Sequence, residues 1–205
     1  GRLDVQGHCL GDGSLQIGFG LGKYPNRNVM DGYAALSRGK QQTTVRASRR
    51  LWPEPERTAI GPIHYEVVEP LRQVRFRLER NACQPIAFDW LFEATVPPFL
   101  EERTHMRHAY RLTAELVRYH QTGVASGWIE VDGQRVEMTP DTWVSTRDHS
   151  WGVRYDVGQP PVALQLHAIA IALGDQGQPV GDGVVDAAVI RAVGHVADQV
   201  NAGCP

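Results

Sequence analysis

One short segment of the chain, Arg147-Asp148-His149-Ser150-Trp151-Gly152, concentrates side chains that could do chemistry. His149 is its natural proton carrier, because the ordinary pKa of histidine lies near neutrality. Arg147 could hold the polar end of a small molecule through its planar guanidinium. Trp151 could form an apolar wall or stabilise a cationic centre. The segment is therefore a candidate site for proton transfer.

The spacing of these residues decides which of them can act together. On an extended strand Arg147, His149 and Trp151 share one face, and Asp148 and Arg154 lie on the other. Asp148 could orient His149 only if the strand bulges, and it otherwise pairs with an arginine. We therefore expect His149 to face the ligand, with Asp148 and Arg154 as a supporting pair. The candidate catalytic residues are His149 and Asp148, and the candidate substrate-binding residues are Arg147, Trp151, Arg154 and Tyr155.

A structural role for the same segment is the main alternative. A buried Asp–Arg pair and a core tryptophan can close the end of a barrel without doing any chemistry. A nucleophilic triad of Ser150, His149 and Asp148 is disfavoured, because three consecutive residues cannot easily line up as nucleophile, base and orienting acid. The sequence also has no Gly-x-Ser-x-Gly elbow.

Other reactive groups are less well placed. His105 and His108 could share a metal ion, but no third ligand stands at a diagnostic spacing, so solvated histidines are the simpler interpretation. Asp89 and Glu93 lie among aromatic residues, where a carboxylic acid with a raised pKa could donate a proton. Outward-facing carboxylates on a half-buried strand are the simpler interpretation here. We predict neither a metal nor a cofactor.

The elements that carry these residues look like short β-strands. Residues 60–80 and 86–96 alternate apolar and polar side chains, and Asp132-Gly133 between two alternating runs indicates a hairpin. Residues 99–122 fit helix, strand or loop equally. The fold class predicted is all-β, a lipocalin-like antiparallel barrel or sandwich over residues 1–157. Residues 158–205 differ in composition and are expected to add a strand and a helix, or part of a second barrel.

Composition narrows the class of protein. With 205 residues and a net charge of −2, the chain is long enough for a sizeable core and not basic enough to suggest a nucleic-acid partner. No apolar run approaches the ~20 residues that span a bilayer. Its three cysteines form no Cys-x-x-Cys pair, so we expect no disulfide framework and a cytoplasmic location, although a removed signal peptide is compatible with a chain that begins at Gly1. The oligomeric state is not predicted.

The motif at residues 147–152, preceded by Gly127-Trp128-Ile129-Glu130-Val131-Asp132-Gly133, resembles proteins related to hydroxyneurosporene synthase. This group is also called carotenoid 1,2-hydratase-like or AttH-like, and the resemblance is to an uncharacterised bacterial branch. Residues 22–28, 46–49 and 61–66 add diffuse support over a span of roughly residues 15–157.

The resemblance implies a lipocalin-like fold, commonly of two barrel-like halves, with a cavity for an apolar molecule. It implies a cofactor-independent enzyme, a hydro-lyase or isomerase that hydrates, cyclises or isomerises an isoprenoid, lipid or polyketide-like substrate. Only Arg147, Asp148, His149, Trp151 and Arg154 match well enough to carry over as site candidates. The chain is short for two halves, and residues 156–205 contain no aromatic residue. A non-catalytic carrier of a lipid or other apolar ligand is the alternative.

Overall fold

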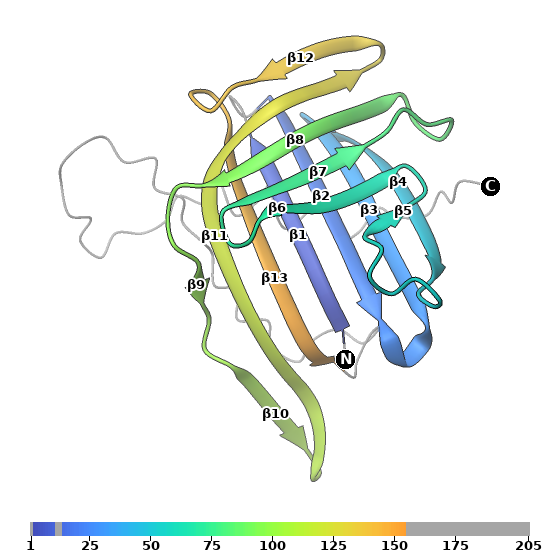
Figure 1. The fold of residues 1–205 in the computed structure, drawn as a ribbon, viewed down its shortest axis with the longest axis vertical. Helices are drawn as coiled ribbons and strands as arrows, with labels where there is room; N and C mark the ends of the chain where they lie inside the picture. Colours follow the sequence, from blue (N-terminus) through green and yellow to red (C-terminus); the bar gives the residue numbers. More distant parts are fainter. Residues whose placement is uncertain (1, 11–13, 155–205) are drawn as a thin grey trace, which may run out of the picture. The chain divides into compact units, whose positions relative to one another are not determined.

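The computed structural model describes residues 2–10 and 14–154, with side chains from Ser14 to Val153, and these residues belong to one compact unit. The described residues form thirteen strands of one sheet (Figure 1). The strands are β1 (Arg2–Leu10), β2 (Leu15–Tyr24), β3 (Val29–Arg38), β4 (Gln41–Arg50), β5 (Ala59–Ile60), β6 (Ile63–Glu69), β7 (Gln73–Leu78), β8 (Ile86–Ala94), β9 (Phe99–Leu100), β10 (Thr104–His108), β11 (Arg111–Val131), β12 (Gln134–Met138) and β13 (Val144–Arg154). A single 3₁₀ turn among the described residues, η1 (Pro25–Arg27), links β2 to β3.

The strand order is β4-β3-β2-β1-β13-β11-β8-β7-β6-β5, and every pairing is antiparallel. Most neighbours follow one another in the chain, but β1 pairs with β13, the last described strand. The long strand β11 pairs with β13 along Ala114–Val124 and with β8 along Gly123–Val131. Strands β10 and β9 pair with β11 on the β8 edge, along residues 111–116 and 119–120, and β12 pairs with residues 127–131 on the β13 edge. Strand β11 therefore joins the two halves of the sheet.

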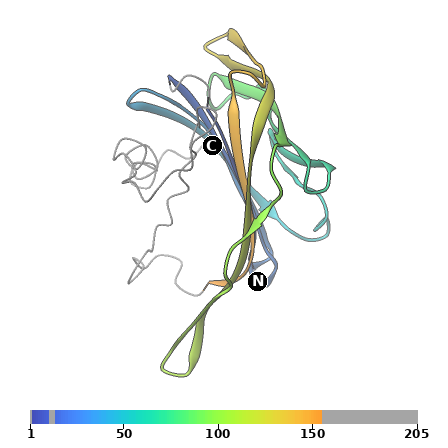
Figure 2. The same cartoon turned by 90° about the vertical axis from the view of Figure 1, so that its left-hand side faces the viewer.

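The sheet curls so that one face encloses the core (Figure 2). In a flat sheet β2 and β7 would lie about 24 Å apart, because five steps in the strand order separate them. Instead the rings of Phe19 and Phe76 lie 5.0 Å apart, and Phe76 packs 4.3 Å from Trp90 of β8. All three side chains are fully buried. Burial of this aromatic cluster holds the half-barrel closed.

Arg49 ties the two ends of the strand order together. Its guanidinium donates to the carbonyl oxygen of Ala59 in β5 at 3.1 Å, and to the carbonyl oxygens of Glu54 and Arg57 at 3.0 and 2.8 Å. The planar fork of arginine suits several carbonyl acceptors at once. The edge strands β4 and β5 are thus joined through a side chain.

The predicted all-β, lipocalin-like antiparallel class is confirmed. The Asp132-Gly133 hairpin is also confirmed, since Val131 pairs with Gln134 and both loop residues have positive φ angles of 51° and 77°. Residues 99–122, which fitted several structures, form β9, β10 and the first half of β11. The strand and helix expected within residues 158–205 lie outside the described residues.

Cys83 is disulfide-bonded, although the three cysteines had indicated no disulfide framework. The cysteine pattern therefore gives no support to a reducing compartment. In the described part of the chain, no helix is both long and apolar enough to cross a membrane.

Candidate functional site

Strand β13 carries the reactive segment between β1 and β11. His149 pairs with Tyr119 of β11, and Arg147 pairs with Gln121, in a ladder without a bulge. Arg147 lies 5.5 Å from the ring of the core residue Phe92. Arg147, His149 and Trp151 therefore share the inner face of the sheet with Tyr119 and Gln121, as strand alternation predicts.

Arg147, His149 and Trp151 form what we call the inner-face row. Arg147 is its buried end, with 3% of its surface exposed. Its Nε and Nη2 donate to the Oε1 atom of Gln121 at 3.0 and 2.6 Å. The amide of Gln121 donates in turn to the carbonyl oxygens of Leu71 and Val96 at 2.8 and 3.3 Å, which fixes the direction of its Oε1. Within the described residues no carboxylate forms an ion pair with Arg147. The guanidinium charge is thus buried and balanced only by neutral groups.

Tyr65 of β6 completes the surroundings of Arg147 from across the half-barrel. Burial raises the pKa of Tyr65 to about 12, against a smaller lowering effect of the charge and hydrogen bond of Arg147. The phenol therefore stays protonated at neutral pH. Its hydroxyl lies close enough to the guanidinium for the charge of Arg147 to affect its pKa, and its own proton remains available for an acceptor.

His149 lies in the middle of the row and is half-buried. Its ring stacks on Tyr119, and the edge of Trp151 lies 5.7 Å away at an interplanar angle of 71°. Burial lowers the pKa of His149, and the nearby charge of Arg147 lowers it further. No hydrogen bond to a described residue engages its imidazole. At neutral pH His149 is a neutral ring with a free acceptor nitrogen, which is the form of a general base.

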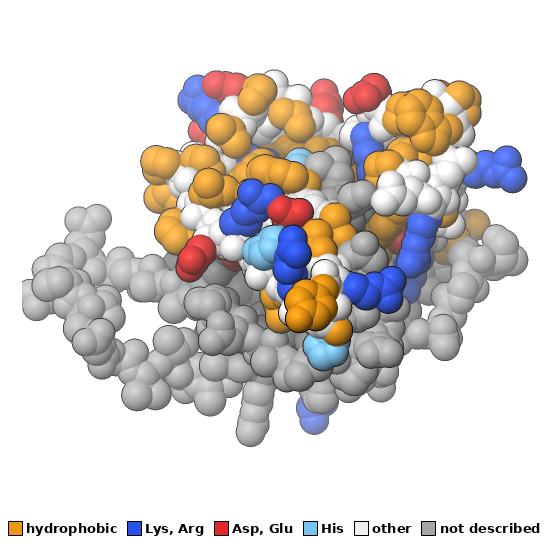
Figure 3. Space-filling model, turned by 90° about the horizontal axis from the view of Figure 1, so that it is seen from below, with side chains coloured by type: hydrophobic (Ala, Val, Ile, Leu, Met, Phe, Trp, Pro, Cys, Tyr) orange, Lys and Arg blue, Asp and Glu red, His pale blue; other side chains and the backbone are white. Residues whose placement is uncertain are grey.

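Trp151 is the exposed end of the row, with 42% of its surface accessible. The site thus runs from a buried cation at Arg147 to an aromatic rim at Trp151. Figure 3 looks at the lower end of the molecule, where hydrophobic side chains lie among arginine or lysine and histidine side chains. An apolar molecule with one polar end matches such a gradient.

Asp148 lies on the opposite face of β13. Its carboxylate is 3.7 Å from the Nε atom of Arg118 in β11, and Arg118 also approaches Glu101 at 3.7 Å. Glu101 lies 3.3 Å from His120, and the ring of Phe99 stacks on that histidine. The structure therefore does not bring Asp148 to His149. Its expected partner Arg154 ends β13 with an undescribed side chain, and Tyr155 lies outside the described residues.

Three neighbours of the row, Tyr65, Gln121 and Phe92, were not identified from the sequence. Each is an ordinary strand residue, and only the cross-strand register and the curl of the sheet bring it to Arg147. Asp89, considered as a proton donor, instead accepts two hydrogen bonds from Arg75 on the outer face. Glu93 accepts a hydrogen bond from Gln73.

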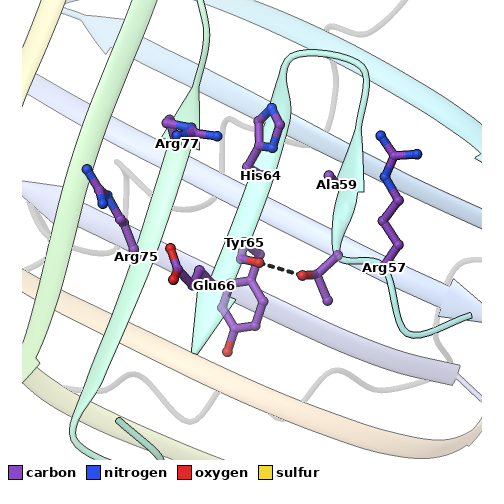
Figure 4. A pocket seen from close by; sticks show the side chains of 8 residues that line it. Arg57, Ala59, His64, Tyr65, Glu66, Arg75 and Arg77 are labelled. Atoms are coloured by element: carbon purple, nitrogen blue, oxygen red, sulfur yellow. Dashed lines mark hydrogen bonds between the residues drawn. The ribbon is translucent and has the colours of Figure 1, made fainter. Parts of the chain in front are cut away.

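A separate hollow opens on the outer face of β6 and β7 (Figure 4). It is lined by Arg57, Thr58, Ala59, His64, Tyr65, Glu66, Arg75 and Arg77. Its arginines are each within ion-pair distance of an acidic residue, namely Glu54, Asp89 and Glu79. The hollow lies away from the inner-face row and has little unpaired charge to offer a ligand.

Metal ligands do not gather in the described part of the chain: no group of three His, Cys, Asp or Glu side chains there could hold an ion. His105 and His108 lie exposed on β10, and the Nε2 of His105 accepts from Arg107 at 3.3 Å.

Two solved structures share the fold. A candidate AttH from Nitrosomonas europaea matches with a TM-score of 0.57 and 14% identity, over 75% of this chain and 51% of its own. Kievitone hydratase from Nectria haematococca matches with a TM-score of 0.55 and 11% identity, over 75% of this chain and 48% of its own. The chain thus spans about half the length of the solved structures it matches, and at these identities the likeness shows the fold alone.

No curated protein matches the chain in sequence. The model of one protein family, described as a family of unknown function and named DUF8625, matches residues 6–172. This match covers most of the chain and includes the whole inner-face row. The chain therefore belongs to the DUF8625 family.

Proposed function

We propose that the protein is a cofactor-independent enzyme that acts on an apolar, unsaturated small molecule at the inner-face row of β13. The observation that carries this proposal is His149, a neutral imidazole without a hydrogen bond to any described residue, set between a buried cation and an aromatic rim. The fold supports it, since one of the solved structures with this fold is named a hydratase. The motif resemblance to the hydroxyneurosporene synthase group points the same way.

Each residue of the motif has a role in this proposal. His149 moves a proton, Arg147 holds the polar end of the substrate, and Trp151 shields the apolar part. Asp148 acts as a positioning residue, because its contact with Arg118 links β13 to β11. Arg154 and Tyr155 follow on the chain and remain candidate substrate-binding residues. The reaction is a hydration, cyclisation or isomerisation of an isoprenoid, lipid or polyketide-like compound.

A variant of His149 tests the proposal. The purified protein is incubated with geraniol, linoleic acid and trans-3-decen-2-one, and products are detected by liquid chromatography with mass spectrometry. His149→Gln should lower the turnover of a converted probe by about 10²-fold or more, the usual contribution of a general acid or base. His105→Gln, on exposed β10, is the matched control and should retain activity. Equal turnover by His149→Gln and the unaltered protein would sink the proposal.

A carrier of apolar ligands is the second candidate function. It is favoured by the two hydrogen bonds of Arg147 to Gln121, which could simply brace the interior of the half-barrel. A carrier would retain linoleic acid through native mass spectrometry and release it chemically unchanged. Release of a product with altered mass or retention time would exclude this candidate.

A further inference from the structure

Hydrogen-bond donors around Arg147 outnumber acceptors. The guanidinium offers five N–H donors, and its Nε and Nη2 both donate to a single acceptor, the Oε1 atom of Gln121. The amide of Gln121 is already used by two backbone carbonyls. The hydroxyl of Tyr65, near Arg147, keeps its proton at neutral pH. As far as the described residues show, the groups without a partner at this end of the row are therefore donors, and the ligand atom that complements them is an oxygen acceptor.

The positive charge of Arg147 determines which charge a reaction intermediate can carry beside it. A buried cation without a carboxylate partner carries a large desolvation cost, which an oxygen with negative charge would offset. Donors held in place in a buried site stabilise an oxyanion that develops during a reaction. The same positive charge opposes a carbocation formed close to it. The buried end of the row therefore favours an anionic intermediate.

His149 is placed to work on the same molecule. It lies two residues from Arg147 on one face of β13, a separation of ~6.6 Å along the strand. Both side chains contact the ring of Tyr119, His149 by stacking and Arg147 at 5.3 Å from the ring centroid. A short conjugated system can thus reach from the donors at Arg147 toward the free nitrogen of His149.

We infer that the site takes an apolar α,β-unsaturated ketone, with its carbonyl oxygen at Arg147 and Tyr65 and its β-carbon toward His149. This inference rests on the proposed function and narrows its substrate class and reaction. The reaction is the conjugate addition of water. This reaction differs from the protonation of an isolated alkene, which would need an acid and an aromatic side chain that shields the cation.

The step balances without a co-reactant. The free nitrogen of His149 takes a proton from water while the water oxygen bonds to the β-carbon, and the alkene electrons shift onto the carbonyl oxygen. Arg147 and Tyr65 hold the resulting enolate oxygen. The proton on His149 then passes to the α-carbon, which restores the ketone and the neutral imidazole. The product is a β-hydroxyketone.

Two isomeric ketones test the inference. The protein is incubated with trans-3-decen-2-one, whose alkene is conjugated to the carbonyl, or with 9-decen-2-one, whose alkene is isolated. We expect the conjugated isomer alone to gain one water, detected by mass spectrometry as 4-hydroxydecan-2-one. Hydration of 9-decen-2-one or geraniol without hydration of the conjugated ketone would overturn the inference and leave the proposed function standing. If no probe is converted, including linoleic acid, both are overturned.

Variants separate the oxyanion role from a structural one. Arg147→Met should lower kcat/KM for trans-3-decen-2-one by about 10²–10³-fold, the effect of losing an oxyanion donor. Tyr65→Phe keeps the ring packing and should lower kcat/KM by about tenfold, which corresponds to the loss of one hydrogen bond. Arg46→Met, at an exposed position of β4, is the matched control and should leave kcat/KM unchanged. Thermal unfolding checks that Tyr65→Phe is folded. If this folded variant is as active as the unaltered protein, the assignment is contradicted, even if Arg147→Met does not fold.

The pH profile gives an independent test. The titratable or charged groups shown facing His149 are Arg147 on its own strand and Tyr119 on β11, while β1 places Val5 opposite its backbone. A base must be unprotonated, so kcat/KM should be level near neutrality and fall as the pH drops below about 6.5. An increase in kcat/KM on acidification would show that His149 acts as an acid and would overturn the inference.

Discussion

Tyr119 of β11 stacks face to face on His149 of β13, with ring centroids 5.5 Å apart and ring planes only 7° from parallel. The two residues are directly opposite one another in the antiparallel ladder. This contact covers one side of the imidazole and contributes to the burial that lowers its pKa. A residue remote in the chain thereby forms part of the surroundings in which the pKa of His149 is lowered.

The lowered pKa of His149 makes the stability of the fold depend on pH. The unfolded chain binds a proton more readily at this position than the folded chain, so acidification below about 6.5 favours unfolding. The contribution is fully present above that pH and is lost as the pH falls toward the lower pKa of the folded state. Urea unfolding at pH 7.5 and pH 5 should show a smaller loss of stability for His149→Gln than for the unaltered protein. An identical loss in both would contradict the burial of this imidazole.

Gln121 should be necessary for a stable Arg147. Gln121→Leu keeps the approximate volume but removes the acceptor of two guanidinium hydrogen bonds and the donor to two carbonyls. Because this change leaves the buried charge of Arg147 without these hydrogen bonds, we expect a loss of about 2–4 kcal/mol in the free energy of unfolding. Gln42→Leu removes an exposed side-chain contact to Thr44 and should change the stability little. Chemical denaturation measures both, and equal effects would show that the interior contact has no special weight.

Gly152, at the end of the reactive motif, should not accept a side chain. Its φ angle is 144°, and a Cβ atom there would lie 1.9 Å from the carbonyl oxygen of Glu115 in β11. Gly152→Ala should therefore force β13 away from β11 and destabilise the fold by about 1–3 kcal/mol or more. Gly39→Ala is a matched control, since that glycine also has a positive φ but no atom within 4 Å of the added Cβ. Thermal unfolding should rank Gly152→Ala clearly below Gly39→Ala, and the reverse order would refute the close approach.

Several local features followed from the sequence because their causes are local. The hairpin at Asp132-Gly133 depends on two residues that adopt positive φ angles, and the structure has both. The division of residues 147–151 between two faces depends only on the two-residue period of a strand. The family motif is likewise contiguous. These predictions needed no knowledge of the neighbouring strands.

Residues 99–122 were ambiguous for a physical reason. The first half of β11 is half-buried at nearly every position, so it has no clean alternation of apolar and polar side chains. Gln121 lies in this stretch, and the sequence therefore gave no sign that it contacts Arg147. On a half-buried strand, only the pairing register shows which residues of the neighbouring strands a side chain contacts.

The sequence alone determined that a β-sheet protein would present Arg147, His149 and Trp151 on one strand face. Only the tertiary structure decided what surrounds them: the pairing of β13 with β11 supplies Tyr119 and Gln121, and the curl of the sheet brings Tyr65 to Arg147. These contacts join residues far apart in the chain, and they form because burying the aromatic core closes the half-barrel. The same closure removes water from His149 and Arg147, which lowers the pKa of His149 beside a cation that no described carboxylate pairs with.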